Sequence, residues 1–254
     1  MSEQLVTETI YPTETIELPS KGLFYPETSP LRDGTIDLFY MTAKHEDILT
    51  SANLIQKGVV LDKLVDALIA TKGVKASDLL LGDLNAVMVA ARILGYGKDY
   101  ETSMKCPSCG QLVEQVVDLS NLSMENEPTT TSNTFSIVLP LSKAEITLRL
   151  LTRGDELAIE KEVKSLRKLT PDLDSEATTR LKSIIVSVNG DSSKPTIWKF
   201  VDTLLVRDVR YLREQYKSFV PDVNFNVHVE CTCGADATTR LPIGIDFFWP
   251  DARV

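Results

Sequence analysis

The chain has 254 residues, of which 43% are hydrophobic, so it can bury the core of one large domain or of two modest ones. Its formal net charge of −9 and its pI of about 4.9 exclude the broad basic surface that phosphate contacts need, so we expect no nucleic-acid partner. The first residues contain neither a basic nor an apolar signal region, and no apolar run approaches the roughly 20 residues of a membrane span. We therefore expect a soluble protein made in a reducing compartment.

Residues 1–40 predict an extended N-terminal arm. Prolines at positions 12, 19, 26 and 30 forbid a helix, and only the stretch from Thr35 to Tyr40 alternates as a strand does. The arm nevertheless carries apolar side chains that a solvated tail would not need. We predict that four of them contact a partner protein: Leu18, Leu23, Phe24 and Tyr25. The alternative is that the arm packs on its own domain.

Residues 41–98 predict a small bundle of three short amphipathic helices. The first helix extends from its N-cap at Thr42 to Gly58, the second covers residues 61–69, and the third carries its apolar stripe over residues 84–94. Arg92 lies beside the third stripe, and we expect its charged end to reach solvent along the surface, with buried anchoring or contact with a partner as the alternatives.

All four cysteines occur in two short pairs, Cys106 with Cys109 and Cys231 with Cys233. A glycine follows each pair, and strand-like stretches flank each one, at residues 100–105 and 112–118 and at residues 223–230 and 237–241. This repeated order of strand, tight turn and strand predicts a zinc-ribbon-like β unit made of residues 99–118 and 223–254. Four thiolates fill the coordination tetrahedron of Zn²⁺, so the predicted metal is structural. The alternatives are two disulfides or four free thiols, and a reducing compartment argues against the disulfides.

Residues 119–222 predict an α+β segment inserted into the ribbon. A loop covers residues 121–133, two strands follow at residues 135–139 and 145–151, and helices are expected from residue 152, over residues 177–188, and over residues 198–219. The predicted fold class is therefore α+β, with helical bundles, a small antiparallel zinc-ribbon-like unit and an extended N-terminal arm.

The chain ends in an unusually aromatic tail. Phe247, Phe248 and Trp249 are consecutive, and termini fray unless they are docked. We predict that these three side chains contact a partner, with packing in the protein's own core as the alternative.

Catalytic constellations are missing from the sequence, so we expect no enzyme and no small-molecule substrate. The two histidines, His45 and His228, are interpreted as solvated surface residues, and no nucleophile elbow, phosphate-binding loop or His-Glu-x-x-His motif occurs. Asp172, Asp174 and Glu176 lack the glycine and the closing glutamate of a calcium loop.

Six short motifs, taken in order, resemble a known family. They are residues 18–22 (LPSKG), 41–49 (MTAKHEDIL), 79–83 (LLLGD), the two cysteine pairs, and residues 247–250 (FFWP). In this order they resemble the baseplate proteins of T-even-like contractile-tailed bacteriophages, a family that includes a baseplate hub subunit and hub-assembly factors.

The resemblance implies a structural or assembly component of a phage tail baseplate. It would act through contacts with other hub or wedge proteins or with copies of itself, in the host cytoplasm during assembly and then in the virion tail. One alternative is an assembly chaperone that is absent from the finished virion. Another, from a different class, is a zinc-ribbon nucleic-acid-binding protein, which the net charge of −9 disfavours.

Overall fold

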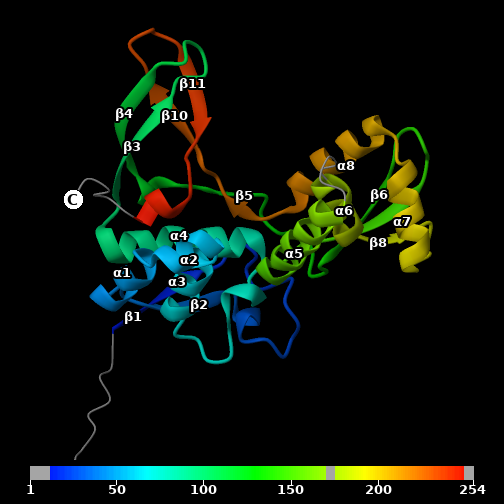
Figure 1. Ribbon diagram of the computed structural model, residues 1–254, viewed down its shortest axis with the longest axis horizontal. Helices are drawn as coiled ribbons and strands as arrows, with labels where there is room; N and C mark the ends of the chain where they lie inside the picture. The colour runs from blue at the N-terminus through cyan, green and yellow to red at the C-terminus, as the bar shows by residue number, and fades with distance from the viewer. Residues whose placement is uncertain (1–11, 170–174, 249–254) are drawn as a thin grey trace, which may run out of the picture.

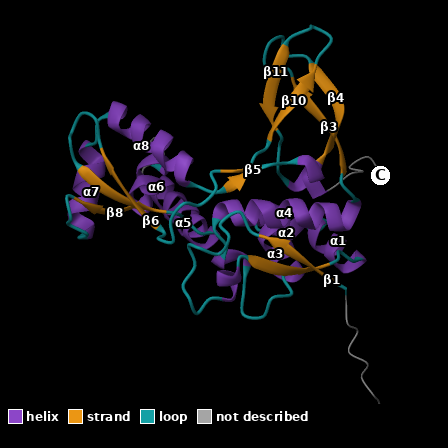
Figure 2. Ribbon diagram, turned by 180° about the vertical axis from the view of Figure 1, so that it is seen from behind, coloured by secondary structure: helices purple, strands orange, loops and turns teal. Residues whose placement is uncertain are grey.

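The chain forms a mixed α+β structure in which helices combine with several small antiparallel sheets (Figure 1). The computed structural model describes residues 12–169 and 175–248, and within these ranges there are eight α-helices. Three parts are visible: a first lobe of residues 12–97, a pair of hairpins that projects from it, and a second lobe of residues 134–219 (Figures 1 and 2). The fold class predicted from the sequence, α+β, is confirmed at this level.

The first lobe packs four α-helices against a two-stranded sheet. In that sheet β1 and β2 are antiparallel, and Ile16 lies opposite Ile36. The elements are β1 (Thr13–Glu17), η1 (Pro30–Asp33), β2 (Thr35–Phe39), α1 (Ala43–Leu49), α2 (Ala52–Lys57), α3 (Val60–Leu68), η2 (Ala76–Asp78) and α4 (Leu81–Tyr96).

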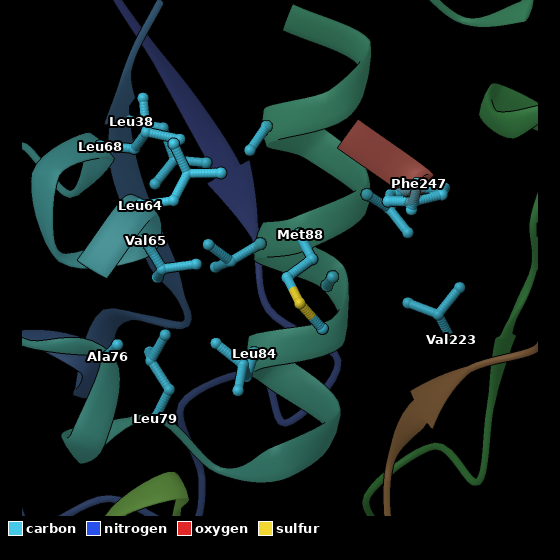
Figure 3. Packing of buried hydrophobic residues seen from close by; sticks show 14 of the residues in the cluster. Leu38, Leu64, Val65, Leu68, Ala76, Leu79, Leu84, Met88, Val223 and Phe247 are labelled. Carbon is cyan, nitrogen blue, oxygen red and sulfur yellow. The ribbon is translucent and has the colours of Figure 1, made fainter. Parts of the chain in front are cut away.

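Helix α4 is the centre of the first core because it is covered on two sides. On one side Leu84 faces the apolar stripe of α3, and on the other side Val223 and Phe247 reach it from the far end of the chain (Figure 3). A helix that is apolar nearly all round is buried rather than amphipathic. Gly82 is required in its first turn, since a Cβ there would lie 1.8 Å from the Pro221 carbonyl oxygen.

Two hairpins, named here the cysteine hairpin unit, stand on the outer side of α4 (Figures 1 and 2). The first hairpin pairs β3 (Asp99–Lys105) with β4 (Leu112–Asp118), and the second pairs β10 (Asn226–Glu230) with β11 (Asp236–Arg240). The neighbouring short elements are η3 (Leu119–Asn121), β5 (Met124–Glu125), β9 (Asp222–Val223) and η4 (Ile245–Phe248).

The second lobe has its own hydrophobic core. A three-stranded antiparallel sheet of order β6-β7-β8 packs with four helices around Leu139, Ile146 and Leu148. Its elements are β6 (Thr134–Val138), β7 (Glu145–Arg149), α5 (Arg153–Leu169), α6 (Glu176–Ile184), β8 (Ile185–Val188), α7 (Lys194–Thr203) and α8 (Val206–Phe219).

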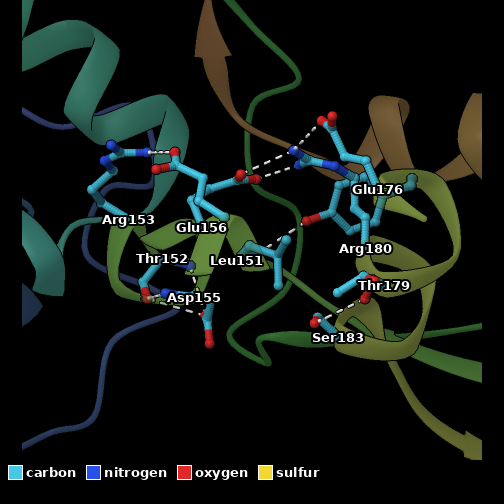
Figure 4. A network of polar contacts seen from close by, with 11 residues as sticks. Leu151, Thr152, Arg153, Asp155, Glu156, Glu176, Thr179, Arg180 and Ser183 are labelled. Carbon is cyan, nitrogen blue, oxygen red and sulfur yellow. Dashed lines mark hydrogen bonds and ion pairs between the residues drawn. The ribbon is translucent and has the colours of Figure 1, made fainter. Parts of the chain in front are cut away.

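Polar contacts at the start of α5 join the two lobes, and Figure 4 shows the neighbouring part of the network, in which Glu156 contacts Arg180. The Arg153 guanidinium donates to both carboxylate oxygens of Asp62 in α3, at 2.7 and 3.0 Å, and its backbone N–H donates to the Leu79 carbonyl at 2.8 Å. Beside it, Glu156 pairs with Arg180 of α6. These contacts bind α5 to the first lobe at one end and to the second core along its length.

Residues 13–34 pack on the protein's own domain, which is the alternative to an arm that contacts a partner, and the strand expected from Thr35 to Tyr40 is present as β2. Strand β1 pairs with β2 over its whole length, and Leu18, Leu31 and Ile36 are buried in the same core as α3 and α4. The prolines do exclude a helix, but extended chain can still bury its apolar side chains when a sheet partner and a helical layer lie nearby. Residues 1–11 of the predicted arm lie outside the described residues.

Three predicted helices are also interrupted. The segment 198–219 forms the end of α7 and the whole of α8, because Leu204 and Leu205 between them have extended backbones. The segment from Thr42 to Gly58 forms two helices, α1 and α2, because Ser51 has an extended backbone and begins the second one. The segment 177–188 is helical only to Ile184, and its β-branched end, Ile185–Val188, pairs with β7 instead. The period of the apolar residues could not reveal this change, since both conformations bury the same side chains.

Within residues 12–169 and 175–248, no helix has the length and apolar character needed to cross a membrane.

Candidate metal centre and predicted contact residues

The four cysteines lie in the turns at the free ends of the two hairpins. Cys106 and Cys109 follow β3, and Cys231 and Cys233 follow β10. Because β4 and β10 run side by side, two turns that are remote in sequence meet at one end of the cysteine hairpin unit (Figure 1). The two strand–turn–strand units predicted from the sequence are therefore present and adjacent.

Both turns are closed by a backbone hydrogen bond to the first cysteine of the pair. The Gly110 N–H donates to the Cys106 carbonyl at 2.8 Å, and the Gly234 N–H donates to the Cys231 carbonyl at 3.0 Å. Both glycines have positive φ, 75° and 73°, which a residue with a Cβ rarely adopts. The second turn is one residue shorter than the first, yet it aims its two thiols at the same point.

The four sulfur atoms form a compact cluster. Sγ of Cys106 lies 3.8 Å from Sγ of Cys233, Sγ of Cys109 lies 3.6 Å from Sγ of Cys231, and all four atoms are within 4.8 Å of one another. Four ligands at 2.3 Å from a tetrahedral Zn²⁺ are separated by about 3.8 Å. A disulfide would need about 2.05 Å. The spacing therefore fits four thiolates that share one ion, and the soft donor set is the one that Zn²⁺ prefers.

The thiols differ in exposure and in acidity. Cys106 is buried and Cys109 and Cys233 are exposed. Backbone N–H groups of Cys109 and Ser108 point at the Cys106 sulfur and lower its pKa to about 6. The Ala235 amide lowers the pKa of Cys233, but the opposing effect of the neighbouring Cys231 and Cys106 thiols and of partial desolvation leaves it raised overall. The turn itself thus favours the thiolate form of Cys106. Four thiolates at this spacing would repel one another unless a cation lay between them.

Below the cysteines, the side chain of Gln115 bridges the two hairpins. Gln115 of β4 donates from Nε2 to the His228 carbonyl at 2.9 Å and accepts from the Glu230 N–H at 3.4 Å, so its amide acts like a missing strand residue between β4 and β10. His228 itself is exposed and lies 3.2 Å from Asp236, which agrees with its interpretation as a surface residue. Sequence reasoning missed Gln115, because a polar side chain on a strand carries no signal of a cross-strand bridge.

Most of the predicted partner-contact residues are buried in the protein's own core. Five of them have at most 8% of their surface exposed: Leu18, Phe24, Tyr25, Phe247 and Phe248. The prediction that they contact a partner is corrected, since their apolar surface is already covered by this chain. Leu23 is half-buried, and Trp249 lies outside the described residues.

Tyr25 is held by a buried polar network as well as by packing. Its hydroxyl donates to Asp83 at 2.6 Å and accepts from the Leu80 N–H at 2.8 Å, while Ser20 donates to the same carboxylate from its N–H and its Oγ. Burial raises the pKa of Asp83, although the hydrogen bonds from Ser20 and Tyr25 oppose this. The LPSKG motif and the LLLGD motif therefore meet in space as partners in one structural network.

The aromatic tail is anchored by Arg92. Its Nε donates to the Phe247 carbonyl at 2.9 Å, and its guanidinium lies 4.9 Å from the centre of the Tyr96 ring and 5.7 Å from that of Tyr100. Arg92 is 2% exposed, so the expectation that it reaches solvent is wrong. The reason is that two tyrosine faces and backbone carbonyls replace its water.

One comparison with known proteins gave a match that covers most of the chain. The protein-family model described as T4 bacteriophage base plate protein matches residues 13–249, a range that includes both lobes and both cysteine pairs. Searches of curated proteins and of solved structures gave no match.

Proposed function

The chain belongs to the T4 bacteriophage base plate protein family, and on this premise we propose that it is a hub or hub-proximal subunit held in the baseplate by protein–protein contacts. Membership of the family implies a structural role in the virion tail, and the family is generally non-enzymatic. The observation that carries the proposal is the extent of the match, which runs from the first strand past the last described residue. A match confined to the cysteine turns would have supported only a metal-binding module.

Within that role we propose a structural Zn²⁺ ion bound by Cys106, Cys109, Cys231 and Cys233. What supports it is the sulfur cluster, whose spacing and donor chemistry suit this ion. The bound ion would supply a permanent cross-link between hairpins whose cysteines are 122 and 127 positions apart in the chain. Four thiolates leave no open coordination position, so the proposed ion has no catalytic part.

Metal analysis of the purified protein tests the zinc proposal. We expect about one zinc per chain, and we expect the Cys109→Ser variant to lose most of it, since three thiolates and a hydroxyl bind Zn²⁺ far more weakly. Ser108→Ala is the matched control, because it changes the same turn without removing a ligand. Full zinc content in Cys109→Ser, or none in the unaltered protein, would refute the site.

Analysis of whole particles tests the baseplate role. A permanent subunit is expected in purified virions by mass spectrometry, in a constant ratio to other tail proteins. An assembly chaperone would instead be found in infected cells and be absent from virions. Normal, infective tails formed without the protein would defeat both versions of the proposal.

A nucleic-acid role for the cysteine hairpin unit has no support in its charge. Residues 99–118 and 226–240 contain six acidic and two basic residues, so this surface repels phosphate.

A further inference from the structure

The solvent face of α8 concentrates positive charge in an acidic protein. Arg207, Arg210, Arg213 and Lys217 are all exposed, and their spacing of three, three and four residues places them along one side of the helix. The row is about 15 Å long at 1.5 Å per residue. Glu214 on the same face pairs with Arg210 at 2.9 Å. The rest of the row faces water in a chain whose net charge is −9.

Exposed apolar side chains adjoin the N-terminal end of this basic row. Val206, in the first turn of α8, is 83% exposed, and Leu205 before it is also exposed. Leu141 is held next to them because the Asp208 carboxylate accepts the N–H groups of Leu141 and Ser142, both at 2.9 Å. Basic and apolar side chains together are typical of protein interfaces, in which arginine is enriched.

A groove between the first lobe and the β5 segment has the complementary, acidic character. Its volume is about 550 Å³, and its acidic lining residues are Glu17, Asp33, Glu125 and Glu127. Met124 adds an apolar side chain that is 54% exposed. The basic residue in the lining, Lys21, is paired with Glu127, which leaves three carboxylates without a cation among the residues that line the groove.

The groove and the basic row are neighbours on one molecule. Asn126, in the loop that borders the groove, donates from Nδ2 to the carbonyls of Lys217 and Val220, at 2.9 and 2.8 Å. The C-terminal end of α8 therefore lies beside the groove, and the rest of the helix points away from it. Two complementary surfaces that adjoin form one self-complementary patch, and such a patch is what a two-fold interface uses.

We propose that two copies of this chain pair through these surfaces, each placing the basic face of α8 against the acidic groove of the other. The occupant is a second copy because charge and apolar side chains match on both sides and because adjacency makes the contact reciprocal. A reciprocal contact closes on itself, so the product is a dimer and not a filament. This pairing is independent of the baseplate role and of the proposed zinc.

Analytical ultracentrifugation of the full chain tests the pairing. We expect a dimer at about 50 mM salt and a dissociation constant at least about tenfold larger at about 500 mM salt, because salt screens exposed ion pairs. Arg207→Glu with Arg213→Glu is expected to abolish dimerisation, and so is Glu17→Lys with Glu125→Lys. The matched control, Lys44→Glu with Lys57→Glu, changes charge on α1 and α2 and is expected to leave dimerisation unchanged.

Mixing the two charge-reversed variants gives the decisive result. In the mixed pair both contacts are complementary, one with the charges reversed and one with the original charges, so we expect a heterodimer, which a loss of folding could not produce. A monomeric unaltered protein at about 50 mM salt overturns the proposal, as does a mixture that stays monomeric. Binding of short duplex DNA by a monomeric protein, lost in the α8 variant, would also overturn it in favour of a polyanion site.

Discussion

Replacing Phe247 with alanine tests whether the aromatic tail is part of the core or a contact held ready for a partner. Its ring is fully buried and packs edge-on against Tyr100 at 5.0 Å and against Phe248 at 5.3 Å between ring centres. Its carbonyl also accepts the Arg92 Nε–H. The substitution therefore removes a ring from the space between α4 and the cysteine hairpin unit.

The expected cost follows from that environment. Truncation of a buried phenylalanine costs about 3–5 kcal/mol, which includes the residual cavity, and each lost edge-on ring pair contributes about 0.5–1.5 kcal/mol of such a loss. In a chain of this size the melting temperature of the first lobe should fall by roughly 10 °C. The backbone carbonyl that Arg92 binds remains, so we expect weakened packing and not complete unfolding.

Hydrogen exchange measured by mass spectrometry, together with thermal unfolding, checks the result. Protection should fall in α4 and β3 but not in α6 and α7, because the second lobe has a separate core. Leu112→Ala is the control, since Leu112 is 61% exposed and its loss should change stability by less than about 0.5 kcal/mol. If Phe247→Ala lowers stability by less than about 1 kcal/mol but prevents incorporation into baseplates, the ring is a partner contact and our reasoning fails.

Three further outcomes are expected. Treatment with a zinc chelator should raise hydrogen exchange in β3, β4, β10 and β11 while leaving the second lobe unchanged, and equal loss of protection in both would contradict a local structural ion. Replacing residues 126–221 with a two-residue Asn-Gly turn should leave a folded first lobe with its hairpins, because Glu125 and Asp222 are paired strand neighbours, and an aggregated product would argue against an inserted segment. Lys98 donates a hydrogen bond to Asp118, and this contact, more than the one from Ser120, lowers the pKa of Asp118 from the ordinary 3.8 to about 2. The Lys98–Asp118 pair therefore stabilises the fold above about pH 4, and this stabilisation is lost as the pH falls towards 2. In Lys98→Ala, NMR titration should show that pKa shifted upward, and an unchanged value would exclude the pairing.

The sequence predicted local structure well where a single periodic pattern persisted. Strands β3, β4, β6, β7 and β11 begin and end within one or two residues of the predicted stretches, because alternation specifies both the strand and its buried face. It failed at Ile184–Ile185, where the chain changes from helix to strand without a glycine or proline. That change depends on β7, which supplies the hydrogen-bonding edge and is remote in sequence.

The residues of the candidate metal centre could be predicted from the sequence. Whether the apolar side chains near the termini pack in the protein's own core or contact a partner could not. Cysteine spacing and the glycine after each pair are local properties of a turn, so the residues could be named before their convergence was known. An apolar side chain near a terminus is equally compatible with the protein's own core and with a partner. For Phe24 and Phe247 only the packing of α4 distinguishes the two.

By itself the sequence determined which residues form the two cysteine turns, that helices and small antiparallel sheets alternate along the chain, and which family motifs occur in which order. Each of these depends on neighbours within a few residues. The tertiary structure decided that β1 and the aromatic tail cover opposite sides of the first lobe, that Arg92 is buried between tyrosines, and that a basic helix face adjoins an acidic groove. Those features depend on segments that meet only after folding, and burial is a property of the assembled surface and not of any one stretch of chain.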